Sequence, residues 1–589
     1  MKLLNNKTFV VIVFTLLLFA CESGNNQQSE SPKSTEQVTE DVSSQAAMDP
    51  DMSERLGKLI KEFTSGFYEI HPDTAVNNGL HDYDGRIPDY SAEGIRKTIA
   101  WYKEMKAKVK ELDDTTLSDK DWLHKQQMEV VVDTALFNLE ELKVMENNAW
   151  YGYYALDPDV YLSRAYAPLE VRMAAFIKHV NAMMVAVPSV KNNLKPMPST
   201  YAHVLKDFAS GLGEFITTTP KEVFADVENP ALQGLMAVST TMTANLFSEL
   251  ADWIDTQPRD ENFALGNERY AHMLWSLERI DTPIEELKLL AEQDLERNLK
   301  AMDKACAEFS PGTSITDCIA KSVANKFSDG PLEGARRQLI MLKQVLLNKG
   351  IVSIPTDDVA LVAESPPHQR SNSAYMTMPG PYEKGMPAIY YIAPPDPDWS
   401  REEQLSYIPG KMDLLGTSTH EVWPGHFLEG LHSNLSGNPV TELSYSYAFT
   451  EGWAHYAEEL MADEGLDYDP EMKIGQLLNA LLRNVRFVSS LGLHTGSMSV
   501  EESEKLFLQK AFNDAGNARQ QAARGTFDPG YLFYTVGKLM IKKLRVDWMD
   551  KHPEKSLKQF HDTFLSFGSA PVPLIRKMML GRGDEGKLF

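Results

Sequence analysis

Two histidines and a glutamate lie close together in the segment His420-Glu421-Val-Trp-Pro-Gly-His426. Imidazole nitrogens are common zinc ligands, and a carboxylate beside them can take a proton from a water molecule on the metal. On a regular helix, residues six apart point about 120° apart, which would keep the two rings from one metal. Pro424 and Gly425 predict a break in the helix, because proline removes a backbone donor and glycine adopts dihedrals that other residues avoid. The segment is therefore compatible with a metal site that depends on a broken helix.

The same residues also fit a purely structural interpretation. Ser418 followed by Glu421 matches a capping box, with Ser418 as the N-cap of a helix that begins there. The two histidines would then be hydrogen-bonded surface groups. This segment alone leaves both interpretations open.

A second segment, Thr450 to Glu459, predicts a helix with Glu451, His455 and Glu458 on one face. Glu451 follows His426 by 25 residues, which leaves room for a helix, a loop and a returning helix. Two histidines and one glutamate, with water in the fourth position, form an established catalytic zinc set. We therefore expect Zn²⁺ as cofactor, with Glu451 as third ligand. His455 and Glu458 are expected to orient the ligands through hydrogen bonds.

The N-terminus predicts export. A basic start precedes the apolar run Phe9 to Ala20, which is shorter than the ~20 residues that span a bilayer. Cys21 directly after it is similar to the lipidated cysteine of a bacterial lipoprotein, although an ordinary signal peptide is the alternative. We expect residues 1–20 to be the signal peptide, residues 21–50 to be a flexible tether and residues 51–589 to be one folded domain.

The rest of the chain predicts a mainly α fold. The 589 residues carry 58 basic and 83 acidic side chains, and this net charge of −25 does not indicate a nucleic-acid surface. Cys306 and Cys318 are expected to form a disulfide, with two buried thiols as the alternative. The clearest strand is Ala388 to Ala393, a small β element beside the site. Apolar residues recur at helical spacing from residue 52 and then over 92–112, 119–146, 168–194, 230–255, 283–305, 332–348, 470–491, 500–515 and 531–550.

Together, H-E-x-x-P-G-H and the later E-G-W-A-x-Y-x-E resemble the bacterial family catalogued as domain of unknown function 885. That family is grouped with the Glu-zincin metallopeptidases, and the resemblance covers nearly everything from about residue 55 onward. Gly79-Leu-His81-Asp-Tyr-Asp84 is similar to the family's early G-x-H-x-x-D. The resemblance implies a large helical zincin-like fold. It also implies His420, His426 and Glu451 as zinc ligands and Glu421 as general base.

Two later stretches extend the resemblance. Arg483 to His494 is similar to the family's R-x-x-R…G-x-H run, with Ser489 where the family pattern has Asp. Pro529 to Lys538 is similar to its P-G…Y-x-x-G-K run. By analogy with related helical peptidases, Tyr534 and His494 are expected to stabilise the oxyanion. Each is otherwise a hydrogen-bonded core residue.

These observations predict a zinc hydrolase that cleaves peptide bonds, mainly of short peptides, in the bacterial cell envelope. Its expected partners are a peptide substrate and, through a lipid anchor, the membrane. An extended peptide is expected to pair with the strand at Ala388 to Ala393. The alternatives are a non-catalytic lipoprotein that binds peptide or metal, and a zinc hydrolase of a non-peptide amide or ester. The intact Glu421 argues against a pure binder, because metal binding alone needs no general base.

Overall fold

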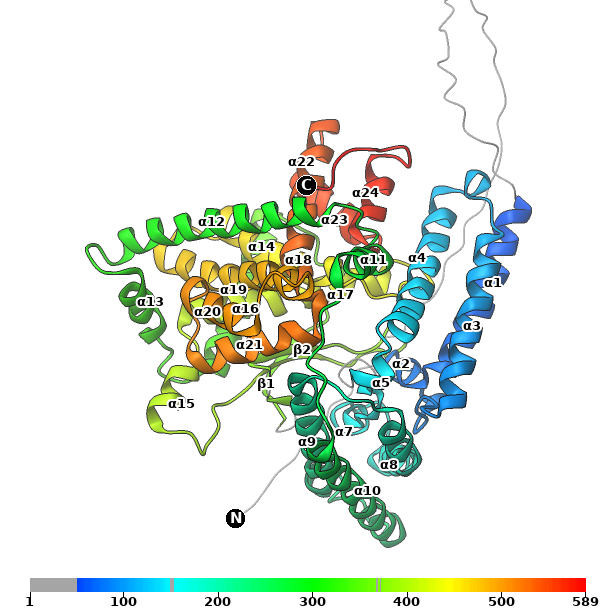
Figure 1. Cartoon of the computed structure of the whole chain (residues 1–589). Helices are drawn as coiled ribbons and strands as arrows, with labels where there is room; N and C mark the ends of the chain where they lie inside the picture. The colour runs from blue at the N-terminus through cyan, green and yellow to red at the C-terminus, as the bar shows by residue number, and fades with distance from the viewer. Residues whose placement is uncertain (1–49, 149–152, 367–368, 371) are drawn as a thin grey trace, which may run out of the picture. The chain divides into compact units, whose positions relative to one another are not determined.

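The computed structural model describes residues 50–148, 153–366, 369–370 and 372–589 (Figure 1). The predicted signal peptide, the lipidation site Cys21 and the tether up to residue 49 lie outside the described residues. Within the described part, helices predominate and one three-stranded sheet is present. This confirms the prediction of a mainly α protein with a small β element.

The first helices form a layer in which α1 and α3 run beside α4 (Figure 1). Ser91 and Ser118 cap α3 and α4, each accepting a hydrogen bond from the backbone N–H three residues on. The single helix predicted over 119–146 is interrupted, because Lys143 adopts a left-handed conformation with φ of 51°. The bounds are α1 Pro50–Ile70, α2 Pro72–Asn77, α3 Ala92–Lys110, α4 Asp119–Leu136, α5 Val144–Asn147 and α7 Asp159–Ser163.

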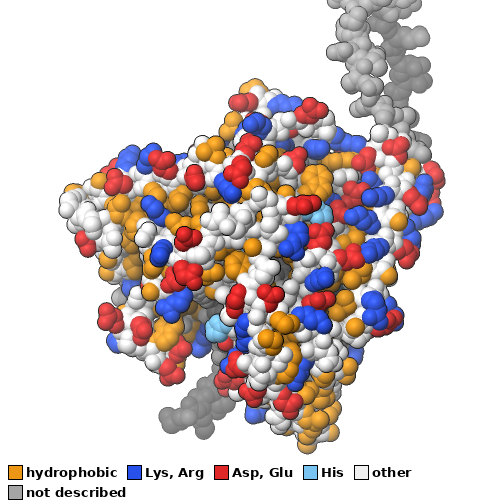
Figure 2. All heavy atoms as spheres, in the orientation of Figure 1, with side chains coloured by type: hydrophobic (Ala, Val, Ile, Leu, Met, Phe, Trp, Pro, Cys, Tyr) orange, Lys and Arg blue, Asp and Glu red, His pale blue; other side chains and the backbone are white. Residues whose placement is uncertain are grey.

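Helices α8 (Leu169–Asn193), α9 (Ser199–Val223) and α10 (Pro230–Thr256) pack around a hydrophobic core of their own. The sequence did not predict α9, whose two glycines and C-terminal Thr-Thr-Thr-Pro run weaken the helical pattern. Among the described helices, α8 alone is long and apolar enough to cross a membrane, but it lies against α10 as a core helix. Figure 2 shows apolar side chains gathered over α10, where Leu235, Val238 and Met242 are exposed.

The middle of the chain continues with α11 (Gly266–Glu278), α12 (Ile284–Phe309), α13 (Ile315–Ala324) and α14 (Pro331–Lys349). The predicted disulfide is present between Cys306 and Cys318, which joins the end of α12 to α13. Both cysteines lie in a small apolar cluster that α19 completes.

The sheet has the order β1-β3-β2, with β1 at Ala360–Glu364, β2 at Ala374–Thr377 and β3 at Ala388–Ile392. Strand β3 runs parallel to β1 and antiparallel to β2. The strand predicted from Ala388 is confirmed, but its predicted role is wrong. It is the central strand, so both of its edges are already paired and an added peptide strand has no edge to join.

The C-terminal helices build the centre of the molecule. Helices α16, α18 and α22 pack on one another or on the long α19, and the small sheet lies beside α16 (Figure 1). The helix predicted to reach residue 515 ends at Lys510, before Phe512 adopts φ of 56°. The bounds are α15 Arg401–Tyr407, α16 Lys411–Glu421, α17 His426–Leu435, α18 Tyr447–Leu460, α19 Pro470–His494, α20 Val500–Lys510, α21 Ala515–Phe527, α22 Phe533–Lys551, α23 Leu557–Leu565 and α24 Val572–Leu580.

Candidate metal centre

The helix break predicted between the two histidines is present. Helix α16 ends at Glu421 and α17 begins at His426, so the rings of His420 and His426 lie 4.7 Å apart between centroids. Gly425 passes so close to the preceding turn that a Cβ there would lie 1.7 Å from the backbone oxygen of His420. Only glycine fits this close approach, which explains its place in the motif.

The break is fixed from α18. Trp453, fully buried, donates a hydrogen bond from Nε1 to the backbone oxygen of Pro424, at 2.8 Å. The capping-box interpretation is wrong, because Ser418 lies inside α16 near its C-terminal end and not before its first turn. Its hydroxyl donates instead to Gln338 Oε1 at 3.0 Å.

Three possible metal ligands converge at this break. The Nε2 atoms of His420 and His426 lie 3.2 Å and 3.3 Å from the same oxygen of Glu451, Oε2. All three ligand atoms lie within 4.8 Å of one another. Two ligands at zinc-bond lengths and a tetrahedral angle would be about 3.4 Å apart. The two distances to Glu451 are close to this value, as one tetrahedral ion between the three side chains would require.

The electrostatics of the three groups also fit a cation. Within the described part of the chain, buried Glu451 Oε2 has no hydrogen-bond donor. Burial disfavours charge on His426, but the Glu451 carboxylate outweighs burial and raises the pKa of the ring to about 9. Burial acts against the Glu451 carboxylate as well, yet the two histidines hold the pKa of Glu451 well below its usual range. A divalent cation would satisfy the same carboxylate with both rings neutral.

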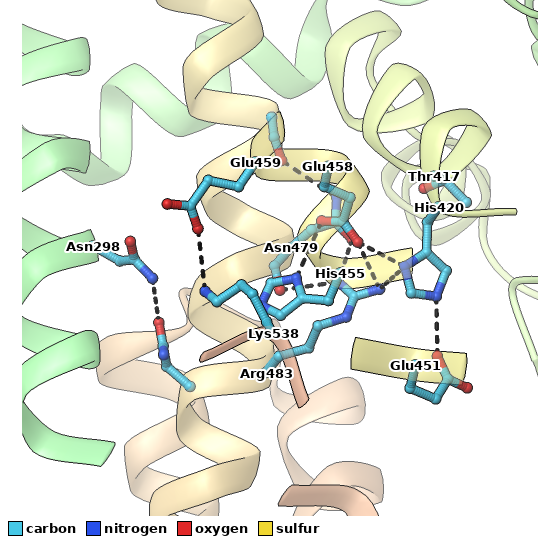
Figure 3. Close-up of polar contacts among 12 residues, drawn as sticks. Asn298, Thr417, His420, Glu451, His455, Glu458, Glu459, Asn479, Arg483 and Lys538 are labelled. Atoms are coloured by element: carbon cyan, nitrogen blue, oxygen red, sulfur yellow. Dashed lines mark hydrogen bonds and ion pairs between the residues drawn. The ribbon is translucent and has the colours of Figure 1, made fainter. Parts of the chain in front are cut away.

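A second carboxylate orients the first ligand (Figure 3). His420 donates from Nδ1 to Glu458 Oε1 at 2.7 Å, which leaves Nε2 to face Glu451. Arg483 Nη2 lies 3.3 Å from the same Glu458 oxygen, and His455 lies 3.7 Å from the other one. Burial would raise the pKa of Glu458, but Arg483 and the hydrogen bond from His420 lower it far below its usual range. Glu458 thus forms a hydrogen bond with the possible metal ligand His420, whereas His455 lies one step further away.

Glu421 directly follows His420, but its carboxylate is not one of the three grouped ligand atoms. It is 7% exposed, and burial raises its pKa, partly offset by His426. Burial and, to a smaller extent, the charge of Glu421 raise the pKa of Tyr390 on the central strand β3. A carboxyl group with a raised pKa suits the exchange of a proton near neutral pH.

Tyr534 reaches the cluster because α22 packs very close to α18. A Cβ on Gly452 would lie 2.6 Å from the Cα of Gly537, so both motif glycines are required for this approach. Tyr534, one turn before Gly537, has its ring 6.3 Å from that of His420. Burial and the Glu451 charge raise its pKa, which keeps its hydroxyl protonated and able to donate.

His494 lies elsewhere. It follows Arg483 by eleven residues on α19, which corresponds to about 16 Å along the helix. Its Nε2 donates to the backbone oxygen of Gly525 at 2.8 Å, and its ring stacks on Tyr270. Burial lowers the pKa of His494 to about 4, so the ring is neutral. The structure therefore places His494 in the core, which was the alternative to its predicted role.

Three residues near the cluster had no predicted role. Arg483 holds Glu458, and Arg486 lies 5.0 Å over the Tyr534 ring. Buried Glu429, one turn after His426, borders a cavity of about 450 Å³ that Tyr445 and Thr450 also line. One sequence signal was available, since both arginines lie in a mainly apolar stretch of α19 that is largely buried, where charged side chains are rare.

Comparison with known proteins adds fold and family. A predicted lipoprotein of unknown function from Shewanella oneidensis is 23% identical, with a TM-score of 0.74 over 89% of this chain and 99% of that one. A predicted lipoprotein from Colwellia psychrerythraea is 16% identical, with a TM-score of 0.74 over 90% and 98%. These likenesses show a shared fold and are consistent with an envelope lipoprotein. No curated protein matches the sequence. The family of bacterial proteins of unknown function DUF885 matches residues 72–579, and the chain belongs to it.

Proposed function

We propose that this protein is a zinc-dependent hydrolase that cleaves peptide bonds, chiefly of short peptides, in the bacterial cell envelope. One observation carries the proposal: His420, His426 and Glu451 bring three ligand atoms within 4.8 Å of one another, with separations of 3.2 Å and 3.3 Å from the two rings to one Glu451 oxygen. The fourth position of such a set is left for water or substrate. The resemblance to Glu-zincin metallopeptidases supports the same reaction class.

Zinc in this site would lower the pKa of a water molecule and polarise the scissile carbonyl. Glu421 would take the proton from the attacking water at its carboxylate oxygen. As the carbon–nitrogen bond breaks, Glu421 would pass that proton to the leaving nitrogen. The Tyr534 hydroxyl would donate a hydrogen bond to the oxyanion that forms on the carbonyl oxygen.

The sheet offers a peptide one edge close to the cluster. Within the described part of the chain, no strand pairs with the outer edge of β2, which lies beside α16. We propose that an extended substrate pairs with β2, and not with β3 as the sequence predicted. The cell-envelope location is supported by the two lipoproteins of similar fold and by the signal that precedes Cys21.

The test replaces the proposed base and leaves the ligands in place. We expect Glu421→Gln to reduce cleavage of a peptide library about 10²- to 10⁴-fold while zinc content stays at one per chain. Exposed Glu402, replaced by Gln, is the matched control. Full turnover by the zinc-bound Glu421→Gln protein would exclude Glu421 as base. Wild-type protein that holds zinc but cleaves no peptide would favour a different amide or an ester substrate. No zinc and no cleavage would favour a binding protein.

A further inference from the structure

Arg486 is a buried cation without a counter-ion. Its side chain is 7% exposed, and its one hydrogen bond to a described residue runs from Nε to the amide oxygen of Gln521 at 2.9 Å. No described carboxylate lies within ion-pair distance of its guanidinium. Burial and the neighbouring charge of Arg524 both lower its pKa. An unpaired buried charge costs stability, so a ligand that neutralised it would be bound favourably.

The neighbouring arginines differ from Arg486 in this respect. Arg483, three residues earlier on the same face of α19, pairs with Glu458 at 3.3 Å. Arg524 pairs with Asp528 at 2.8 Å. Three guanidinium groups therefore share two carboxylates here, and the excess positive charge belongs to Arg486.

Arg486 also lies within reach of the metal cluster. Its guanidinium carbon is 5.0 Å from the centre of the Tyr534 ring, and that ring is 6.3 Å from the ring of His420. The guanidinium is thus at most about 11 Å from His420. One extended peptide residue spans about 3.5 Å, so this distance suits a group one or two residues beyond the bond that is cut.

We propose that Arg486 binds a carboxylate of the substrate, next to Tyr534 and within about 11 Å of His420. The planar guanidinium fork matches a carboxylate in geometry and charge. The carboxylate is either the C-terminus of the peptide or an acidic side chain near it. This inference rests on the proposed function and narrows it to substrates that carry a negative charge on the leaving side of the scissile bond.

The test measures binding instead of turnover. The zinc-loaded full chain with Glu421→Gln is titrated calorimetrically with acetyl-Ala-Ala-Ala, with its C-terminal amide, and with acetyl-Ala-Ala-Asp amide. We expect a carboxylate-bearing peptide to bind about 10- to 100-fold more tightly than the plain amide. Tighter binding of the free acid would show that Arg486 binds the C-terminal carboxylate of the peptide. Tighter binding of the Asp amide would show that it binds an acidic side chain.

Substitutions then assign the preference to Arg486. Arg486→Met should abolish it without changing zinc content or binding of the plain amide, and Arg486→Lys should keep part of it. Arg519→Met, in an exposed side chain, is the matched control. If the Arg486 guanidinium serves only to bind substrate, the unfolding midpoint of Arg486→Met should equal or exceed that of the protein with Arg486. A midpoint far below the Arg519→Met control would show a structural ion and overturn the inference.

Equal binding of the three peptides would also overturn the inference, and so would undetectable binding of all three. A carboxylate preference that survives Arg486→Met would overturn it as well. Cleavage by the wild type separates this inference from the proposed function. Cleavage without any carboxylate preference defeats only the role of Arg486. A carboxylate preference without any cleavage defeats only the hydrolase.

Discussion

Two clusters of buried charge lie side by side in the C-terminal helices, and adjacent residues of α18 belong to them (Figure 3). Glu458 supports the metal cluster, which comprises His420, His426 and Glu451. Glu459 belongs to what we call the paired cluster, which comprises Asp294, Arg297, Glu459, Lys538 and Lys542.

The two clusters differ in how their charges are satisfied. In the paired cluster, fully buried Lys538 lies 3.2 Å from Asp294 and 3.4 Å from Glu459, and Arg297 and Lys542 also contact Glu459. Each buried charge there has a partner within the chain. In the metal cluster, two imidazole nitrogens face one carboxylate oxygen, Glu451 Oε2, which accepts no hydrogen bond within the described part of the chain. The first cluster is complete as the chain folds, whereas under the proposed function the second is completed by a cation. Substitutions should therefore separate stability from metal binding.

The largest expected effect is on metal binding. Glu451→Ala removes the oxygen that both histidines face, so we expect zinc affinity to fall by more than the 10- to 100-fold typical of an orienting residue. Zinc content after dialysis, measured by atomic emission, should drop from about one per chain to below about 0.1. Glu296→Ala, at an exposed position of α12, is the control. Full zinc content in Glu451→Ala would show that the convergence of the three side chains is not a metal site.

The opposite result is expected in the paired cluster. Lys538→Met leaves the carboxylates of Asp294 and Glu459 short of their buried partner, and breaking a buried ion pair costs about 3–5 kcal/mol. Urea unfolding of the zinc-loaded protein should show this loss, while zinc content stays near one per chain.

Lys300→Met removes an exposed lysine and should change the free energy of unfolding by less than about 1 kcal/mol. If Lys538→Met lost zinc but kept its stability, the assignment of the two clusters would have to be reversed.

The contrast between the clusters also explains what the sequence could predict. Local signals were sufficient for most of the long helices and for the break at Pro424 and Gly425, because periodicity and proline act within a few residues. The spacing of Glu451 after His426 indicated a third ligand, and the resemblance implied the same residue. The pairing of Arg483 with Glu458 depends on how α19 packs against α18, and the central position of β3 depends on two short strands around it. Neither is encoded locally.

His494 is a residue for which the sequence predicted a functional role that the packing of the helices does not support. Its motif was recognised, but a motif does not tell how far along a helix the site extends. Helix α19 is continuous from Arg483 to His494, so the two side chains lie about 16 Å apart along its axis. A functional role was thus assigned to a residue that the packing of α19 carries into the core.

A smaller effect is expected where the metal cluster meets its support. Glu458→Gln keeps an acceptor for His420 Nδ1 but removes the charge that Arg483 and the imidazole share. Zinc affinity should fall about 10- to 100-fold, measured by competition with a chelator. His203→Ala, at an exposed position, controls for unspecific metal binding. An unchanged affinity would mean that Glu458 belongs with the structural charges.

The smallest effect per step is on pH dependence. In the metal-free protein, Glu451 raises the pKa of His426 to about 9, from about 6.5 in the unfolded chain. The stabilisation by this pair is therefore complete below about pH 6.5 and is lost as the pH rises through about 9. Zinc must displace the same proton, so its affinity should rise up to about tenfold per pH unit over this window and level off above it. Chelator competition measures the zinc affinity, and thermal unfolding in the same buffers measures the stability of the metal-free protein. As the pH rises, the first should increase and the second should decrease, because the same proton stabilises the metal-free cluster and competes with zinc.

If the stability of the metal-free protein did not fall over this window, Glu451 and His426 would not share that proton. The contrast with the paired cluster would then lose its electrostatic basis.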